Sequence, residues 1–362
     1  MFSFDRKTGI IKTSHGKIQT PVFMPVGTNA TVKSLSPEDL KEIGAQIILA
    51  NNYHLFLRPG SKNIAKMGGI HKFMNWNKPI LTDSGGFQVY SLGEKHPESP
   101  NDDVNLIETS DEGVQFKSHI DGSLHFWTPE QAMESQYQIG ADIVMALDVC
   151  TLDKATKTQA REALDRTNNW LIRCKKYLLS NQLTNNQSLF GIIQGGMHKD
   201  LRIASAKFVV DCDLPGIAVG GETIGYNMDG TEEVMSWIKD LLPKDKPIYA
   251  MGLGLRPSDL VRAVKAGFDM FDCVAPTRLA RNGALYCSDS PTERIDISKS
   301  IYALDENPID NCCDCPTCKT YSRAYLHHLF KCKELLFYRL ASMHNLRVMI
   351  KTVENLRQSP GV

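Results

Sequence analysis

Short apolar runs recur along the chain, and each is followed by a turn containing Gly or Asp and then by a longer amphipathic stretch. Runs of four to six apolar residues between turn residues are typical of strands that are buried on both faces of a parallel sheet. The pattern predicts seven such strands, over residues 46–50, 79–82, 142–147, 188–193, 216–219, 247–251 and 268–271.

Two of the stretches between these runs carry clear helix signals. Thr128 is a favourable N-cap, and Pro129 and Glu130 suit the first turn of a helix that ends near Gly140. The stretch 258–267 has apolar positions at helical spacing and ends in a glycine. Strands that alternate with helices indicate an α/β protein with a parallel sheet.

About eight such units over this length predict a closed (β/α)8 barrel of the TIM type, and an open doubly wound sheet is the main alternative. No G-x-G-x-x-G follows the first run, which argues against a dinucleotide-binding fold. We expect residues 1–300 to form most of the barrel, 301–350 a zinc-binding subdomain and 351–362 a C-terminal tail, all within one domain.

Polar residues and glycines follow most of the predicted strands. They are Asn51, Asp83, Asp148, Gln194-Gly195-Gly196, Gly220-Gly221 and Asp272. A single Asp in such a position is usually only a helix cap. In a closed barrel, however, the carboxyl ends of all strands converge on one mouth, where active sites lie. Three carboxylates, an amide and two glycine pairs at equivalent positions therefore predict an active site.

Two carboxylates on opposite sides of a glycosidic bond can divide its cleavage into two easier steps. One attacks the anomeric carbon and holds the sugar covalently, and the other handles the proton of the leaving group. Gln194, the backbone amides of the glycine pair and a third Asp can read the edge of a flat heterocycle, while Phe87 and Met251 can clamp its faces. These residues indicate glycosyl transfer or hydrolysis at a nucleoside.

A C-x-C-x-x-C sequence near the C-terminus, followed by a histidine, predicts a structural zinc site. Cys313, Cys315, Cys318 and His344 supply three thiolates and an imidazole, a closed tetrahedral set that leaves no position for water. Other residues compete for a place in the set: Cys312, Cys332, His327 and His328. Reduced cysteines without a metal are the alternative.

Composition is ordinary for a globular protein, with 42% hydrophobic and 23% charged residues among 362. The N-terminal residues do not resemble a signal peptide and no apolar run is long enough to span a bilayer, so we expect a cytoplasmic location and no membrane partner. The formal net charge is zero, but residues 315–362 carry eight Lys or Arg and two Glu. That excess suits either docking on a phosphate backbone or a solvated helical face.

Several motifs resemble those of the tRNA-guanine transglycosylases, of bacterial type, and they occur in the family's order along nearly the whole chain. The motifs are Asn52-Tyr53-His54-Leu55-Phe56-Leu57-Arg58-Pro59-Gly60, Thr82-Asp83-Ser84-Gly85-Gly86-Phe87-Gln88, Gly191-Ile192-Ile193-Gln194-Gly195-Gly196, Met270-Phe271-Asp272-Cys273-Val274-Ala275-Pro276-Thr277-Arg278 and the C-x-C-x-x-C…His set. The resemblance implies a pentosyltransferase with an α/β barrel and one structural Zn²⁺. Its members exchange guanine at the wobble position of tRNAs with G-U-N anticodons for a 7-deazaguanine, in queuosine biosynthesis.

The resemblance also implies a role for each matching residue. Asp272 is the expected nucleophile, which forms a covalent tRNA–enzyme intermediate, and Asp83 the general acid/base. The expected base-binding residues are Ser84, Gly85, Gly86, Phe87, Asp148, Cys150, Gln194, Gly220, Gly221, Glu222 and Met251. The expected RNA-binding residues are Arg256, Thr277, Arg278, Leu279, Ala280 and Arg281. A homodimer is expected too, although Met343 replaces a glutamate that bacterial members place at the dimer contact.

Two departures from the bacterial pattern bear on the incoming base. Glu222 stands where bacterial members usually have leucine, and Tyr226 where they have glutamate. An acidic side chain there favours queuine, whose secondary amine and diol could meet it, and Phe87 in place of a tyrosine points the same way. Cys150 matches the bacterial type, which uses the aminomethyl precursor. A noncatalytic tRNA-binding partner subunit is the alternative function, but it would be expected to have lost Asp83 or Asp272.

Overall fold

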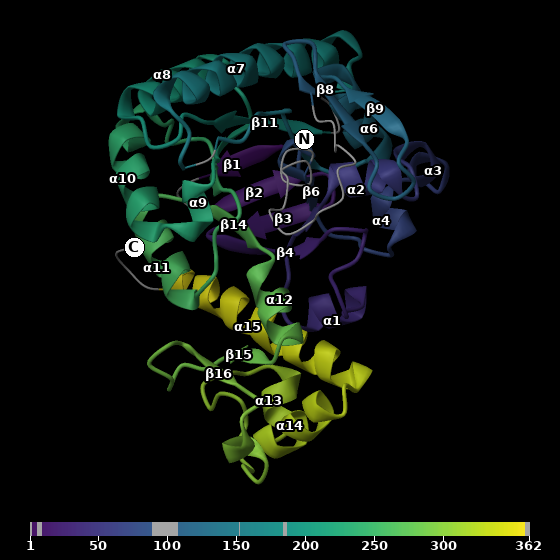
Figure 1. The fold of residues 1–362 in the computed structure, drawn as a ribbon, viewed down its shortest axis with the longest axis vertical. Coiled ribbons are helices and arrows are strands. Elements are labelled where there is room, and N and C mark those ends of the chain that lie inside the picture. The colour runs from purple at the N-terminus through teal and green to yellow at the C-terminus, as the bar shows by residue number, and fades with distance from the viewer. Residues whose placement is uncertain (1, 6–8, 89–107, 152, 184–186, 359–362) are drawn as a thin grey trace, which may run out of the picture.

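The structure, a computed structural model, describes residues 2–5, 9–88, 108–151, 153–183 and 187–358. Eight parallel strands form a closed barrel at its centre (Figure 1). Around the barrel their order is β10-β11-β12-β13-β14-β4-β5-β6. The strands are β4 (Val22–Gly27), β5 (Ile48–Ala50), β6 (Ile80–Thr82), β10 (Ile143–Met145), β11 (Ser188–Ile193), β12 (Gly216–Val219), β13 (Ile248–Ala250) and β14 (Met270–Cys273). The predicted barrel is confirmed, and the open sheet is excluded.

The seven predicted strands are all present, and the eighth, β4, was not predicted. Pro25 interrupts its apolar run, and proline is unusual inside a sheet because it cannot donate a ladder hydrogen bond. In the structure Pro25 lies opposite Cys273 at the end of the β14–β4 pair, close to the mouth of the barrel.

Side chains alternate between two apolar layers along each strand. Met24, Leu49 and Ile192 fill the interior of the barrel, whereas their neighbours Phe23, Ile48 and Ile193 pack between the strands and the outer helices. Because both faces of every strand are buried, the runs read as continuously apolar instead of alternating.

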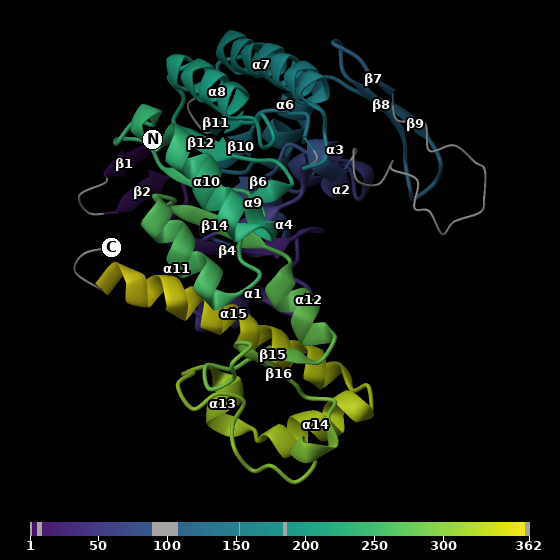
Figure 2. The same cartoon turned by 60° about the vertical axis from the view of Figure 1, so that its left-hand side comes forward.

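A ring of helices surrounds the barrel (Figure 2). In chain order the described helices up to the seventh barrel strand are α1 (Pro37–Glu42), α2 (Asn52–Leu57), α3 (Ser61–Lys66), α4 (Ile70–Phe73), α6 (Pro129–Ile139), α7 (Lys157–Ser180), α8 (Lys199–Asp211), α9 (Thr223–Tyr226) and α10 (Met228–Ile238) with the 3₁₀ turn η2 (Lys239–Leu241). The two predicted helices are confirmed: α6 starts in a capping box on Thr128, and α11 (Pro257–Ala266) ends at Gly267 in a left-handed conformation.

An antiparallel sheet of β1 (Ser3–Asp5), β2 (Ile10–Thr13) and β3 (Gly16–Gln19) packs against the amino-terminal end of the barrel. Its β2–β3 turn is fixed by Asp142, which is buried. His15 Nδ1 lies 2.8 Å from one oxygen of this carboxylate and His71 Nε2 lies 3.2 Å from the other. The two imidazole rings are nearly parallel, 13° apart, with centroids separated by 3.5 Å. Both rings therefore direct a nitrogen at one carboxylate, as in a bidentate hydrogen-bond clamp.

A second antiparallel sheet projects beside α2 and α6 (Figure 2). It consists of β7 (Glu108–Thr109), β8 (Val114–Lys117) and β9 (Leu124–Trp127). Trp127 packs edge-on against Phe56 of α2, with ring centroids 4.5 Å apart. A hydrogen bond of 3.1 Å joins the hydroxyl of Tyr53, also in α2, to Nδ1 of His119. These contacts join the sheet to the helix that follows β5.

The C-terminal unit lies at one side of the barrel and has an apolar core of its own, which extends from Ala280 to Ala341. It contains α12 (Ala275–Arg281), β15 (Ala284–Tyr286), β16 (Arg294–Asp296), η3 (Ser300–Tyr302), α13 (Pro316–Thr320), α14 (Arg323–Lys331) and the first part of α15 (Leu335–Gln358). Helix α15 then continues along the barrel, against α11 and β4. The boundary expected at residue 350 falls inside this helix, and residues 359–362 lie outside the described part.

Several basic residues of the segment 315–362 are neutralised within the fold. Arg339 pairs with Asp39 of α1, Arg323 with Asp305, and Arg347 with Asp314 and Glu354. Because these arginines are already paired with carboxylates, the excess of positive charge in this segment is only a weak indication of phosphate binding. Over the ranges that the structure describes, no helix combines the length and the apolar character needed to cross a bilayer.

Candidate active site

A cavity of about 330 Å³ opens at the carboxyl ends of the barrel strands. Three aspartates face it: Asp83 directly after β6, Asp148 after β10 and Asp272 near the end of β14. Gln194, which follows β11, and the pair Gly220-Gly221, which follows β12, complete the polar lining. The structure thus brings together the residues that the sequence placed after separate strands.

Asp272 is held by two hydrogen bonds on the same oxygen. The hydroxyl of Tyr249 donates to Oδ1 at 2.6 Å, and the backbone N–H of Gly252 donates to it at 2.7 Å. No described residue donates to Oδ2. Burial raises the pKa of Asp272, and the two hydrogen bonds oppose that rise. One oxygen is therefore anchored while the other is free to act as a nucleophile.

Asp83 is surrounded by the start of α2. The backbone N–H of Asn52 donates to Oδ1 at 2.9 Å, and the side-chain amide of Asn51 donates to Oδ2. Burial raises the pKa of Asp83 to about 7, with a contribution from the negative charge of Asp272. A carboxyl group with a pKa near neutrality can both give and take a proton, which is what a general acid/base requires.

Asp148 accepts one hydrogen bond on each oxygen. The hydroxyl of Ser84 donates to Oδ1 at 3.0 Å, and the Gln194 amide donates to Oδ2 at 2.8 Å. Burial raises the pKa of Asp148. Asp148 and Gln194 therefore present a carboxylate acceptor and a side-chain amide on one wall of the cavity.

Three glycines let the backbone approach this wall closely. A Cβ on Gly86 would lie 2.6 Å from the carbonyl oxygen of Asp148, and one on Gly220 would lie 2.9 Å from the amide nitrogen of Gln194. Gly85 has a φ of +83°, and a Cβ there would crowd Tyr53 at 3.2 Å. Side chains at Gly85 and Gly86 would collide with Tyr53 and Asp148, and of the three glycines only Gly220 lines the cavity itself.

Phe87, Cys150, Glu222 and Met251 also line the cavity, as the sequence predicts. Phe87 is half-exposed at the rim. Burial raises the pKa of the Cys150 thiol to about 12, which makes it a packing residue and not a nucleophile. Glu222 is exposed, and its Oε2 accepts a 2.9 Å hydrogen bond from the backbone N–H of Asp153.

The cysteine cluster lies outside this cavity, in the C-terminal unit. The Sγ atoms of Cys313, Cys315 and Cys318 and a ring nitrogen of His344 all lie within 4.8 Å of one another. His344 Nε2 lies 2.7 Å from the carbonyl oxygen of Tyr286, which assigns the proton to Nε2 and leaves the lone pair of Nδ1 facing the sulfurs. The competing histidines have other neighbours: His327 contacts the carbonyl of Ile297, and His328 lies beside the exposed Cys332. The set fits one metal ion.

Comparison with known proteins agrees with this geometry. The family model described as "Queuine tRNA-ribosyltransferase" matches residues 4–359. Proteins of that name from Caldanaerobacter subterraneus subsp. tengcongensis and Herpetosiphon aurantiacus are 50% and 49% identical to this chain, each over 98% of its length and over 89% and 86% of their own. A third, from Dictyoglomus turgidum, is 47% identical over 98% of this chain and 88% of its own length.

This chain belongs to the queuine tRNA-ribosyltransferase family. The recognition from sequence motifs is thereby confirmed, and so is the expected enzyme class, a pentosyltransferase. Sequence reasoning missed Tyr249, Asn52 and Arg202, which contact the predicted site residues or their backbone. Two signals were available: Asn52 opens one of the motifs quoted above, and Tyr249 places a polar hydroxyl inside an otherwise apolar strand run.

The residues that the family resemblance places against RNA differ in exposure. Arg256 and Arg278 are exposed, and Leu279 and Arg281 are half-buried. Thr277 and Ala280 are buried, and Ala280 belongs to the apolar core of the C-terminal unit. Arg281 is turned back on its own helix, where it donates to the carbonyl of Thr277 at 2.9 Å. The side chains of Thr277 and Ala280 therefore do not face solvent.

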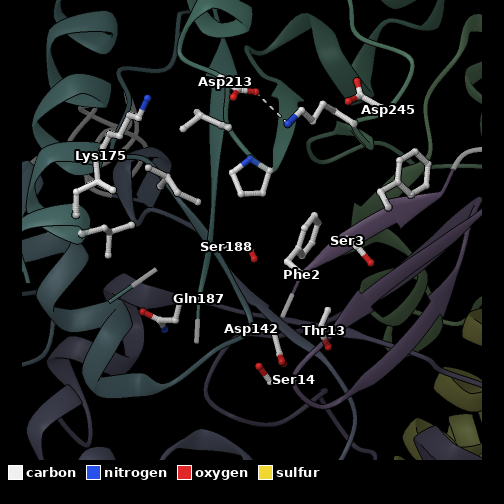
Figure 3. A pocket seen from close by; sticks show the side chains of 17 residues that line it. Phe2, Ser3, Thr13, Ser14, Asp142, Lys175, Gln187, Ser188, Asp213 and Asp245 are labelled. Carbon is white, nitrogen blue, oxygen red and sulfur yellow. Dashed lines mark hydrogen bonds and ion pairs between the residues drawn. The ribbon is translucent and has the colours of Figure 1, made fainter. Parts of the chain in front are cut away.

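A larger hollow of about 760 Å³ lies at the opposite, amino-terminal end of the barrel (Figure 3). Its wall includes Phe2, Lys175 and Gln187, and an ion pair of 3.1 Å joins Asp213 to Lys246 beside it. None of the residues expected in catalysis or base binding lines this hollow. Its size does not make it the active site, because active sites of this fold form where the strands end, not where they begin.

Proposed function

We propose that this enzyme exchanges guanine at the wobble position of tRNAs with G-U-N anticodons for a 7-deazaguanine base, in queuosine biosynthesis. These are the tRNAs for aspartate, asparagine, histidine and tyrosine. The observation that carries the proposal is the convergence of Asp83, Asp148 and Asp272 on one cavity with different hydrogen-bond environments. Family membership supports the same reaction class.

The exchange is a double displacement at the C1′ atom of the ribose. The free oxygen of Asp272 attacks C1′ as the bond to guanine breaks, and the protonated carboxyl group of Asp83 gives its proton to the departing base. The incoming base then loses its N9 proton to Asp83, and its nitrogen attacks C1′ and releases Asp272. The pKa of Asp83, raised to about 7 by burial, suits both directions of proton transfer.

The base edge is matched by complementary groups. The carboxylate of Asp148 accepts from the ring N–H and amino group of a guanine-like base, whereas the amide of Gln194 and the backbone around Gly221 donate to its oxo group. Phe87 and Met251 enclose the two ring faces. Stacking worth about 1–3 kcal/mol per base offsets the few kcal/mol that it costs to flip the nucleotide out of the anticodon loop.

The incoming base is proposed to be queuine, with the aminomethyl precursor as the second candidate. Glu222 and Tyr226 both line the cavity and are exposed at its rim. One oxygen of Glu222 is engaged by Asp153, which fixes the carboxylate where a cationic substituent of the base would pass. Arg256 and Arg278, which are both exposed, are assigned to the tRNA backbone.

The cysteine cluster is assigned to one structural Zn²⁺. Three thiolates and one imidazole leave no coordination position for water, so the ion would stabilise the C-terminal unit and take no part in the exchange. A homodimer remains a prediction from the family resemblance.

The test uses an unmodified tRNA with a G-U-N anticodon and a labelled base. The wild-type protein should incorporate the base and, when trapped, form a covalent tRNA adduct that survives a denaturing gel. Asp272→Asn should abolish both. An adduct that survives in Asp272→Asn would reassign the nucleophile, and a wild-type protein that binds tRNA without any exchange would favour a noncatalytic partner subunit.

A further inference from the structure

Arg202, in the first turn of α8, is a fully buried guanidinium that lines neither of the two cavities described above. It donates to three backbone carbonyls: Nε to Gly196 at 2.8 Å, and one terminal nitrogen to Ile193 at 2.9 Å and to Gly220 at 2.8 Å. These carbonyls belong to the ends of β11 and β12 and the loops that follow them. One side chain therefore ties together the two strand ends that carry Gln194 and Gly221.

The positive charge of Arg202 is not neutralised nearby. Within the described ranges, no carboxylate lies within salt-bridge distance of it, and its second terminal nitrogen has no hydrogen-bond partner. Burial lowers the pKa of Arg202 to about 10, so the group still carries its charge at neutral pH. Buried charges are normally paired, and an unpaired one is costly to fold around, which calls for an explanation in function.

A second buried polar atom without a hydrogen-bond partner in the described part of the chain, on Gln194, also lies beside Gly221. The oxygen Oε1 of Gln194 has no partner among the described residues. A Cβ built on Gly221 would lie 3.0 Å from the unpaired Arg202 nitrogen and 3.3 Å from this oxygen, so both flank the Gly221 backbone. Gly221 itself has a φ of +106°, which holds its peptide in an orientation that favours glycine.

We propose that Arg202 is a positioning residue that orients the Gly220–Gly221 backbone and Gln194 toward the oxo edge of the base and places a positive charge behind that edge. This inference rests on the proposed function. The wall formed by Asp148 accepts hydrogen bonds, so the base's oxygen must face the donors on the Gln194–Gly221 side. A fixed charge behind those donors, in a site shielded from water, favours the oxygen most as negative charge grows on the departing base.

The test compares two free bases in the wild type and in variants: 7-deazaguanine and its 6-thio analogue, which keeps the ring N–H but accepts hydrogen bonds weakly. The measured quantity is the ratio of their inhibition constants against guanine exchange. In Arg202→Met the preference for the oxo base should fall about tenfold, the size of one charge-assisted hydrogen bond, with the KM for tRNA unchanged. Arg173→Met is the matched control, because Arg173 also donates to two loop carbonyls, at 3.0 Å each, but is not part of the cavity lining.

An unchanged ratio in a folded Arg202→Met, with only a lower melting temperature, would reduce Arg202 to a structural role and overturn the inference. If Arg202→Met does not fold, Arg202→Lys serves instead, because it keeps the charge but cannot bridge the carbonyls. Its ratio should fall too, and an unchanged ratio there would also overturn the inference. A wild-type protein that does not exchange guanine would instead refute the proposed function, which separates the two failures.

Discussion

Tyr249 on β13 donates its hydroxyl hydrogen bond to Asp272 on the neighbouring strand β14, at 2.6 Å, and both side chains are buried. The bond fixes Oδ1, and no described residue donates a hydrogen bond to Oδ2. It also favours the ionised carboxylate, against the effect of burial. Tyr249 thus fixes one oxygen of the proposed nucleophile and favours its ionised form.

Tyr249→Phe should slow formation of the covalent adduct about tenfold or more, since a hydrogen bond to a charged group contributes about 1.5–3 kcal/mol. Single-turnover kinetics with trapped tRNA measure this rate. Tyr286→Phe is the control, because Tyr286 is equally buried and its hydroxyl donates to the carbonyl of Leu255 and not to a carboxylate. Equal rates in the two variants would remove the assigned role of Tyr249.

The rate of adduct formation should fall as the pH rises through about 7, because Asp83 must be protonated to serve the departing guanine and burial raises its pKa to about 7. Asn51→Leu removes a donor that stabilises the ionised form, so it should move the falling limb to higher pH. Asn51 also caps α2. Ser36→Ala, which removes the cap of the remote helix α1, is therefore the control and should leave the limb in place.

Cys318→Ala should abolish metal binding and lower the melting temperature of the C-terminal unit, because the free energy of metal binding is free energy of folding in a closed site. Zinc content and calorimetry measure the two effects. Cys332→Ala, at an exposed cysteine of the same unit, should change neither. A stable Cys318→Ala protein without bound metal would contradict the structural zinc site.

Glu222→Leu should shift the choice of base from queuine toward the aminomethyl precursor when equal amounts of both compete for one tRNA. Mass spectrometry of the tRNA nucleosides gives the product ratio. Glu233→Leu on α10 replaces an exposed glutamate outside the cavity and should leave the ratio unchanged. The same ratio in Glu222→Leu as in the wild type would show that Glu222 does not select the base.

Asp142→Asn should lower the free energy of unfolding by about 2–3 kcal/mol, because a buried carboxylate that accepts from His15, His71 and the N–H of Ile80 loses its charge. Burial alone would raise the pKa of Asp142, but the hydrogen bonds from His71 and His15 hold it below the usual range. The stabilisation is therefore present above about pH 4 and lost as the pH falls further. In denaturant titrations the difference between wild type and variant should be largest at pH 7 and should shrink as the pH is lowered below about 4.

The sequence was sufficient for seven of the eight barrel strands, because a strand buried on both faces is a continuous apolar run whatever its neighbours are. It was also sufficient for Asp83, Asp148, Gln194 and Asp272, since each directly follows or ends such a run. The eighth strand, β4, was not predicted because Pro25 interrupts its apolar run. Its pairing with β5 and β14 depends on closure of the barrel. Strand and turn signals are local, so they can be found without knowing the fold.

Only the tertiary structure decided which groups act together. Tyr249 reaches Asp272 across 23 positions of the chain, and Asn52 reaches Asp83 across 31, because adjacent barrel strands bring distant segments side by side. The raised pKa of Asp83 comes first from burial, which no residue pattern reports. The pairing of Arg339 is also invisible in the sequence. Its charge contributes to a basic segment that suits phosphate binding, but in the structure it is neutralised by Asp39, 300 positions away. Burial and electrostatic pairing are properties of the packed molecule, and they convert a list of polar residues into a site.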